Sequence, residues 1–294
     1  MAIFYMILSA LLIAILGLLA KLDQSAMPLS LAVFLRLLVP VLLLLPFMKL
    51  NEIKRSLFHA NRIQWLRAGF AFAAQYCLFA YIMHASLLNA ILLYNTGPLF
   101  IPLLSALIYH EKISQRAILS VMLGFIGIAL VLHPHATDFN RYSLLGLASG
   151  FFMACSQVCF HKASHTETVN YNMFSVYALS SCFAIVPMLF GNTSSLSLLL
   201  HLNLLTLLAL LGMALASLGN QVFRYLAYKR TATPAHLAPF MYLAVLISGI
   251  IDWLGFHDTP TLLSSFGAIL VLIATLIIAF KKNITLTKIN RSTL

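Results

Sequence analysis

The stretch AGFAFAAQYCLFAYIMHASLLNAILLYNTGPLFIPLLSALIYH, which runs from Ala68 to His110, contains no Asp, Glu, Lys or Arg. A helix needs roughly 20 apolar residues to cross the ~30 Å hydrocarbon layer of a bilayer, so this stretch is long enough for two spans. In lipid every backbone polar group must be satisfied within the protein, and a helix does this within one segment. The stretch therefore predicts two membrane-spanning helices.

Charged residues divide the rest of the chain in the same way. Thr168–Phe223 is long enough for two further spans, and Gln24–Met48 forms one span that only Arg36 interrupts. The other uncharged stretches are each about one bilayer long, and they are Met1–Ala20, Ala117–Thr137, Tyr142–His161, Thr231–Ile251 and Thr259–Phe280. The chain is therefore predicted to be an all-α membrane protein of ten helices, over 2–20, 28–48, 65–83, 88–109, 115–133, 142–161, 171–190, 203–224, 233–255 and 260–280.

Composition supports a single membrane domain. Of the 294 residues, 62% are hydrophobic and 9% are charged, whereas a soluble domain of this length needs a more polar exterior. The predicted connections are too short for a globular domain outside the membrane. The longest polar connection, Asn51–Asn61, is predicted to be a surface loop, and residues 283–294 are predicted to form a cytoplasmic tail.

The net charge of +11 is explained by where the positive residues lie. If the N-terminus is cytoplasmic, all 18 lysines and arginines except Lys21, Arg141 and Arg36 fall in cytoplasmic connections or the tail. Arg67 and Arg224 belong to this cytoplasmic group. Cytoplasmic loops of membrane proteins carry an excess of Lys and Arg. The pattern therefore predicts both termini inside, in a bacterial cytoplasmic (inner) membrane, and no nucleic-acid partner.

The chain also repeats internally when it is shifted by half its length. Ala80-Tyr81 then meets Ala227-Tyr228, and His110-Glu111 meets His257-Asp258. A rival shift pairs Pro98 with Pro239 but loses the other matches. The predicted repeats, 1–140 and 141–282, hold five spans each, and an odd number places them in opposite orientations. Inverted repeats are typical of alternating-access carriers, which bind substrate near the midplane between the repeats.

Several motifs resemble the EamA family of the drug/metabolite transporter superfamily. They are Ala85–Leu88, Gly97–Phe100, His110–Ser114 and Gly124–Gly127 in the first half, and Thr233–Phe240, Trp253 and His257–Pro260 in the second. The second half looks most like the branch that includes S-adenosylmethionine carriers. The resemblance covers essentially the whole chain, and it implies ten helices around a central cavity and transport of small metabolites. Asp252 and Asp258 depart from the family, which usually has a glycine and a glutamate there.

Charged residues in or near the spans are the first candidates for function. Arg36 is the one Lys or Arg assigned to a span, and its guanidinium can clamp a substrate carboxylate. The alternative is that it snorkels outward or holds a neighbouring helix. Asp252, the one acid in a predicted span, is expected to pair with Arg36, to load a proton or to be solvated at the interface. Glu111 and Asp258 are predicted to be gate or helix-end residues.

Polar residues in the middle of the spans form a second group of candidates. Uncompensated amides are costly in lipid, so these side chains are expected to point inward. Some should line a cavity and contact substrate, and others should only hydrogen-bond between helices. The set comprises Gln75, Tyr76, Tyr94, Asn95, Gln157, Asn220, Gln221 and His236.

Enzyme motifs are poor. His161 and His165 have the spacing of metal ligands, but no glutamate lies between them, and they are expected to be solvated at a helix end. No P-loop, H-E-x-x-H or G-x-S-x-G motif occurs, so no catalytic residue, metal or cofactor is expected. The sequence favours a secondary transporter of a small polar or zwitterionic metabolite, as monomer or homodimer, with export preferred. The alternatives are an S-adenosylmethionine uptake or exchange carrier and, less favoured, a membrane-embedded lipid-modifying enzyme.

Overall fold

The computed structural model describes residues 1–22, 29–58, 60–82, 84, 87–109, 114–132, 142–189, 204–256 and 262–279. Within these ranges the chain forms helices joined by turns, and it contains no strand. The helices are α1 (Ala2–Leu22), α2 (Leu29–Leu44), η1 (Leu45–Phe47), α3 (Leu50–Phe58), α4 (Arg62–Ile82), α5 (Leu87–Tyr94), α6 (Gly97–Tyr109), α7 (Gln115–Leu132), α8 (Ser143–Thr166), α9 (Val169–Leu189), α11 (Leu204–Tyr228), η3 (Pro234–His236), η4 (Ala238–Tyr242), α12 (Leu243–Phe256) and α13 (Leu262–Ala279).

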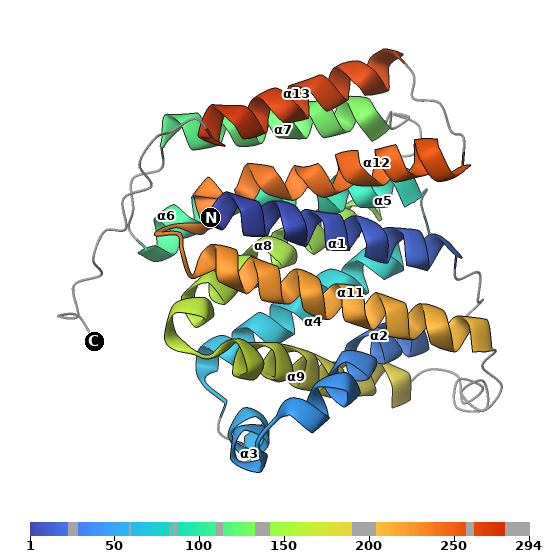
Figure 1. The fold of residues 1–294 in the computed structure, drawn as a ribbon, viewed down its shortest axis with the longest axis vertical. Helices are drawn as coiled ribbons and strands as arrows, with labels where there is room; N and C mark the ends of the chain where they lie inside the picture. The colour runs from blue at the N-terminus through green and yellow to red at the C-terminus, as the bar shows by residue number, and fades with distance from the viewer. Residues whose placement is uncertain are drawn as a thin grey trace.

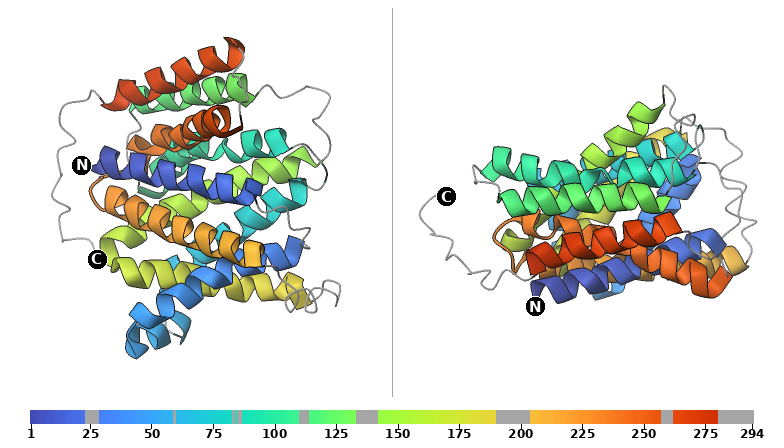
Figure 2. Two further views of the ribbon diagram at one scale, coloured as in Figure 1. Left: turned by 45° about the vertical axis from the view of Figure 1, so that its right-hand side comes forward. Right: turned by 90° about the horizontal axis from the view of Figure 1, so that it is seen from above.

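The long helices lie side by side in two layers (Figures 1 and 2). One layer contains α13, α12, α1, α11 and α2, and the other contains α7, the α5–α6 pair, α8, α4 and α9. The most extensive contacts join α7 to α13, α4 to α8, α1 to α11 and α2 to α9. The fold is therefore a bundle in which each long helix packs against a partner that is distant in sequence.

The contacts follow the same pattern in the two halves of the chain. If the first five predicted spans are matched in order with the last five, α1 corresponds to α8 and α4 corresponds to α11. The pair α1–α11 then corresponds to α8–α4, and α1–α12 corresponds to α8–α6; all four pairs are in contact. Under the same matching, α2–α9 and α7–α13 each join a helix to its own counterpart.

Each predicted span overlaps a helix or a pair of helices. Six helical segments are long and apolar enough to cross a membrane: Ala2–Leu19, Ser30–Phe47, Ala90–Tyr109, Ser143–Thr166, Val169–Met188 and Leu204–Tyr228. Shorter apolar helices cover Gln115–Val131, Ala238–Ile251 and Ser265–Ile277. Large apolar side chains such as Leu107, Leu204 and Leu205 are more than two thirds exposed, as expected where lipid is the solvent. The chain is therefore a multi-pass membrane protein.

One prediction of local structure was wrong, and two predicted spans are irregular. The predicted surface loop Asn51–Asn61 is largely the helix α3, because Leu50–Phe58 contains no Gly or Pro and its Ser56 hydroxyl lies 2.8 Å from that of Ser175 in α9. The fourth predicted span, 88–109, is interrupted between α5 and α6. The ninth, 233–255, begins as the short 3-10 helices η3 and η4. Proline removes a backbone donor and so favours such breaks.

Glycines allow α8 to approach the break between α5 and α6. A Cβ atom added at Gly150 would lie 2.7 Å from the Leu93 carbonyl oxygen and 3.1 Å from the Gly97 nitrogen. A Cβ added at Gly146 would lie 2.8 Å from the Tyr81 ring. Gly146 and Gly150 form a G-x-x-x-G motif, which here packs helices of one chain closely together.

We predict that Gly150→Ala destabilises the protein by about 1–3 kcal/mol, because the new methyl group meets backbone atoms that cannot move aside. The matched control is Gly249→Ala in α12, where an added Cβ has no neighbour within 4 Å. The control should be neutral or slightly stabilising, since alanine favours helix over glycine. The thermal midpoints of both purified variants test this, and equal midpoints would contradict the close approach.

Candidate functional site

Arg67 is a charged side chain buried inside the bundle. It lies in the second turn of α4, and only 1% of its surface is exposed. Its Nη1 donates to the carbonyl oxygen of Asn172 at 3.1 Å and to Asn172 Oδ1 at 3.2 Å. Its Nη2 donates to Gln221 Oε1 at 3.3 Å. The guanidinium carbon lies 3.6 Å from the centre of the Phe160 ring, which places the cation on an aromatic face.

Asn172, which accepts hydrogen bonds from Arg67, is itself held by further hydrogen bonds. This fully buried amide is on α9, and its Oδ1 also accepts a hydrogen bond from Gln64 Nε2 at 2.8 Å. Its Nδ2 donates to the carbonyl oxygen of Ala163 at 3.0 Å, near the end of α8. The same carbonyl also accepts the backbone N–H of Glu167 at 3.0 Å, so Asn172 adds a second bond at the end of α8. Asn172 thus connects α4, α8 and α9 around one guanidinium.

Arg224 is a second buried cation, in the last turns of α11. Only 5% of its surface is exposed, and its Nε donates to the Ser9 hydroxyl of α1 at 3.4 Å. The Ser9 hydroxyl donates in turn to Asn220 Oδ1 at 2.6 Å. Asn220, Gln221 and Arg224 share one face of α11, because residues three or four apart lie together on a helix. That face carries both the acceptor for Arg67 and the second arginine.

Further polar pairs extend this network. The Tyr228 hydroxyl donates to Gln157 Oε1 at 3.0 Å, and the Tyr177 and Ser217 hydroxyls lie 2.5 Å apart. In the described part of the chain, no carboxylate pairs with Arg67 or Arg224. Neutral amides, hydroxyls and carbonyls surround both charges. We refer to Gln64, Arg67, Gln157, Asn172, Asn220, Gln221, Arg224, Tyr228 and Ser9 as the arginine network.

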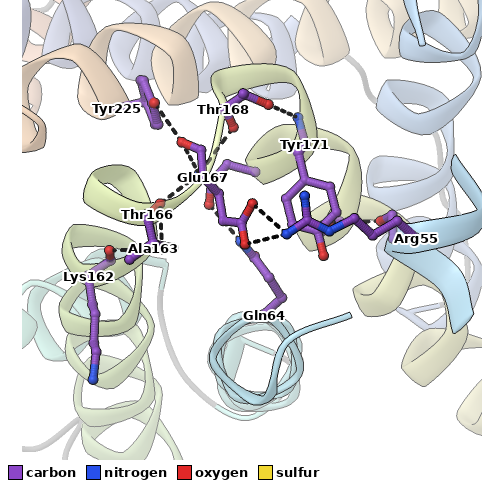
Figure 3. A network of polar contacts seen from close by, with 12 residues as sticks. Arg55, Gln64, Lys162, Ala163, Thr166, Glu167, Thr168, Tyr171 and Tyr225 are labelled. Atoms are coloured by element: carbon purple, nitrogen blue, oxygen red, sulfur yellow. Dashed lines mark hydrogen bonds and ion pairs between the residues drawn. The ribbon is translucent and has the colours of Figure 1, made fainter. Parts of the chain in front are cut away.

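The arginine network ends at a polar cluster on the surface (Figure 3). Arg55 Nη2 lies 2.9 and 3.1 Å from the two carboxylate oxygens of Glu167, and the Arg55 guanidinium lies over the Tyr171 ring. The Tyr225 hydroxyl donates to the Glu167 carbonyl oxygen at 2.7 Å. These contacts join α3, the turn between α8 and α9, and α11 at one end of the bundle. The Arg55 side chain is 57% exposed, so the ion pair itself contributes little stability.

The expectation that Arg67 and Arg224 lie in connections between helices was wrong, and Arg36 is therefore not the one basic residue within a long helix. Position near a span end suggested a loop, but both arginines lie within helices and are buried. A signal was present in the sequence. Gln64 and Arg67 are three residues apart, and Gln221 and Arg224 repeat that spacing, so each pair marks a polar helix face.

The predicted polar candidates fall into two groups. Gln157, Asn220 and Gln221 belong to the arginine network. The others are half-buried and lie elsewhere: Gln75 and Tyr76 in α4, Tyr94 at the end of α5, Asn95 in the following turn and His236 in η3. Asn95 Nδ2 donates to the Ile91 carbonyl at 2.8 Å, and Tyr76 packs on Phe72.

The remaining charged candidates are only partly described. Arg36 in α2 is half-buried, and its guanidinium carbon lies 5.2 Å from the centre of the Phe79 ring. Asp252 is within α12, but its side chain lies outside the described residues, as do Glu111 and Asp258. The role of these acids as gates and the pairing of Asp252 with Arg36 remain predictions.

The expectation that His161 and His165 are both solvated was wrong for His161, which is 4% exposed. The Nε2 atoms of the two histidines lie 2.9 and 3.2 Å from the same Thr231 carbonyl oxygen. Among the described residues, no group of three His, Cys, Asp or Glu side chains is arranged to hold a metal ion. The two histidines instead fasten the end of α8 to the turn that follows α11.

Comparisons with known proteins relate the first part of the chain to one family. Residues 1–133 match the EamA-like transporter family. The chain is therefore similar to this family over these residues. A riboflavin transporter of Vibrio cholerae is 29% identical over 49% of this chain and 49% of its own length. A pseudopaline exporter of Pseudomonas aeruginosa is 25% identical over 67% of this chain and 68% of its own. An S-adenosylmethionine uptake transporter of Rickettsia bellii is 27% identical over 65% and 63%.

The fold of this chain is also found among solved structures. One crystal structure superposes with a TM-score of 0.75 over 94% of this chain and 96% of its own, at 16% sequence identity. The match to the Vibrio cholerae relative spans about half of that protein, and the matches to the other two span about two thirds. The relatives are named for transport of different compounds, so these similarities leave the substrate open.

We predict that Asn172→Ala destabilises the protein by about 2–4 kcal/mol, because it leaves the buried Arg67 charge and the Gln64 amide short of acceptors. The matched control is Asn170→Ala, an exposed asparagine on the same helix, which should change stability by less than ~0.5 kcal/mol. Equilibrium unfolding of both purified variants measures the difference. Similar losses in the two variants would show that the Asn172 contacts do not hold the buried charge.

Proposed function

We propose that the chain is a secondary transporter that moves a small polar or zwitterionic metabolite across the bacterial cytoplasmic membrane by alternating access, with export favoured. The observation that carries this proposal is the EamA family match, together with relatives named as transporters or exporters of small molecules. The buried polar network agrees with it, since polar and ionisable groups inside membrane proteins mark substrate or ion pathways more often than structural sites.

The architecture that we propose is two inverted five-helix repeats, residues 1–140 and 141–282, around a central substrate site. The corresponding contacts of the two halves support this arrangement, because α1–α11 and α8–α4 are the same pair under exchange of the repeats. The interruptions between α5 and α6, and at η3 and η4, occur in corresponding spans. Discontinuous helices in matching positions of two repeats are typical of carrier binding sites.

The proposed orientation places both termini and the polar cluster of Arg55 and Glu167 in the cytoplasm. The basic residues of the short connections support this orientation. The arginine network then lies at the cytoplasmic end of the bundle and holds that end closed. Half-buried Arg36, Gln75, Tyr76, Tyr94, Asn95 and His236 are proposed to face the substrate pathway farther from that end. Glu111, Asp252 and Asp258 are proposed as gate or coupling residues.

Uptake or exchange of S-adenosylmethionine is the specific alternative. It is supported by the relative from Rickettsia bellii, which is named for that uptake, and by the motifs Thr233–Phe240 and His257–Pro260 in the second half. No P-loop accompanies them in the chain, so exchange or movement down a gradient is the form of transport proposed.

We predict that proteoliposomes carrying the protein accumulate labelled solute by counterflow, with separate preparations preloaded with S-adenosylmethionine or with a mixture of amino acids. Accumulation should exceed that of protein-free vesicles and should fall about tenfold or more in Arg36→Gln, because a neutral amide cannot replace a bidentate clamp on a carboxylate. The matched control is Arg62→Gln, an exposed arginine at the start of α4, which should retain accumulation.

The outcomes separate the proposals. Accumulation of amino acids without S-adenosylmethionine would remove the specific alternative and leave the broader function. Accumulation that is unchanged in Arg36→Gln would remove Arg36 from the substrate pathway. Failure of folded protein to accumulate any compound of either preparation would contradict the transport proposal for these solutes.

A further inference from the structure

Arg224 is a buried cation whose hydrogen-bonding capacity is mostly unused by the protein. A guanidinium carries five N–H donors. Within the described part of the chain, Arg224 donates one hydrogen bond, the 3.4 Å contact from Nε to the Ser9 hydroxyl. Neither of its terminal amino groups has a protein acceptor there. Arg67 differs, since both of its terminal amino groups have acceptors and its face is covered by Phe160.

The charges around Arg224 are also unbalanced. Arg67 donates to Gln221, which lies three residues before Arg224 on the same helix, so the two like charges are near each other. The carboxylates whose side chains the structure describes are Glu52 in α3 and Glu167, which pairs with Arg55 at the surface. The interior near Arg224 is therefore positive.

A buried charge that lacks partners is expensive, at several kcal/mol after relaxation of the protein. Two paired amino groups on a planar guanidinium match the two oxygens of a carboxylate or a phosphate. A negative oxyanion beside Arg224 would supply acceptors for the unused donors and would also reduce the repulsion from Arg67.

We propose that Arg224 binds a carboxylate or phosphate group of the transported solute. This inference rests on the proposed transport function and adds a chemical class to it: the solute carries an oxyanion. Arg67 is the positioning residue, because it already has protein partners and fixes the local charge. A phospholipid headgroup offers the same phosphate chemistry, since Arg224 is one turn from the end of α11, and the experiment must separate the two sources.

The test measures binding without transport. The full chain is placed in phosphatidylcholine nanodiscs, and its thermal midpoint is followed by the fluorescence of Trp65 and Trp253. The probes are sodium benzoate, inorganic phosphate and benzamide, the last being a neutral analogue of benzoate with nearly the same shape. At matched ionic strength, benzoate or phosphate should raise the midpoint by about 2–4 °C, and benzamide should not.

Two variants locate the effect. Arg224→Gln should lose the shift caused by the anions. Arg230→Gln should keep it, because Arg230 is an exposed arginine six residues farther along that donates to the Leu226 carbonyl. A shift that persists unchanged in Arg224→Gln would overturn the assignment. If Arg224→Gln does not fold, the thermal midpoints of the unaltered protein still test the proposal. Equal shifts with benzoate and benzamide, or no shift with either anion, would overturn it.

A lipid arm identifies the source of the oxyanion. If addition of phosphatidylglycerol to the nanodiscs abolishes the benzoate shift, a lipid phosphate occupies the site and the solute assignment is overturned. If the shift persists, the site accepts a soluble anion. The counterflow measurement is independent of this result. Anion binding without any counterflow would contradict the transport function alone, whereas counterflow without an anion effect would contradict the oxyanion inference alone.

Discussion

Two guanidinium groups buried inside a membrane protein must find their partners within the protein or its ligand, and much of this structure follows from that requirement. The desolvation penalty of an unpaired charge in the bundle is larger than the stabilisation that most single contacts provide. Arg67 therefore fixes the positions of three other helices: Asn172 on α9, Gln221 on α11 and Phe160 on α8 all contact its side chain. Asn172 is itself held by the end of α8.

The same contacts tie the two halves of the chain together. Arg67 belongs to the first half, and its side-chain partners Asn172, Gln221 and Phe160 all belong to the second. Arg224 belongs to the second half, and its partner Ser9 belongs to the first. Under the proposed mechanism this junction is the closed cytoplasmic end. Because its bonds are made to neutral groups, water or an anionic solute can replace them at a lower cost than for a buried ion pair.

The spans could be predicted from the sequence because apolar length and charge position report directly on the bilayer. What the sequence did not reveal were features that depend on distant partners. Their positions near span ends suggested that Arg67 and Arg224 lie in loops. Their burial became evident only from their contacts with α9 and α1. The helix α3 depends on the Ser56–Ser175 contact across the fold. Two spans are irregular near Pro98 and Pro239, and the positions of the breaks depend on packing, such as that of Gly150 against Leu93 and Gly97.

The most direct test of the account is the distance between two spin labels at the end that the arginine network holds closed. Arg62 and Lys229 are exposed, and they mark the start of α4 and the turn after α11. Cysteines at these positions, in a chain whose four native cysteines are replaced, can be labelled and measured in liposomes by pulsed electron resonance. The account predicts one distance population without solute and a second, longer one when the solute identified by counterflow is added. A single unchanged population in a preparation that transports would contradict it.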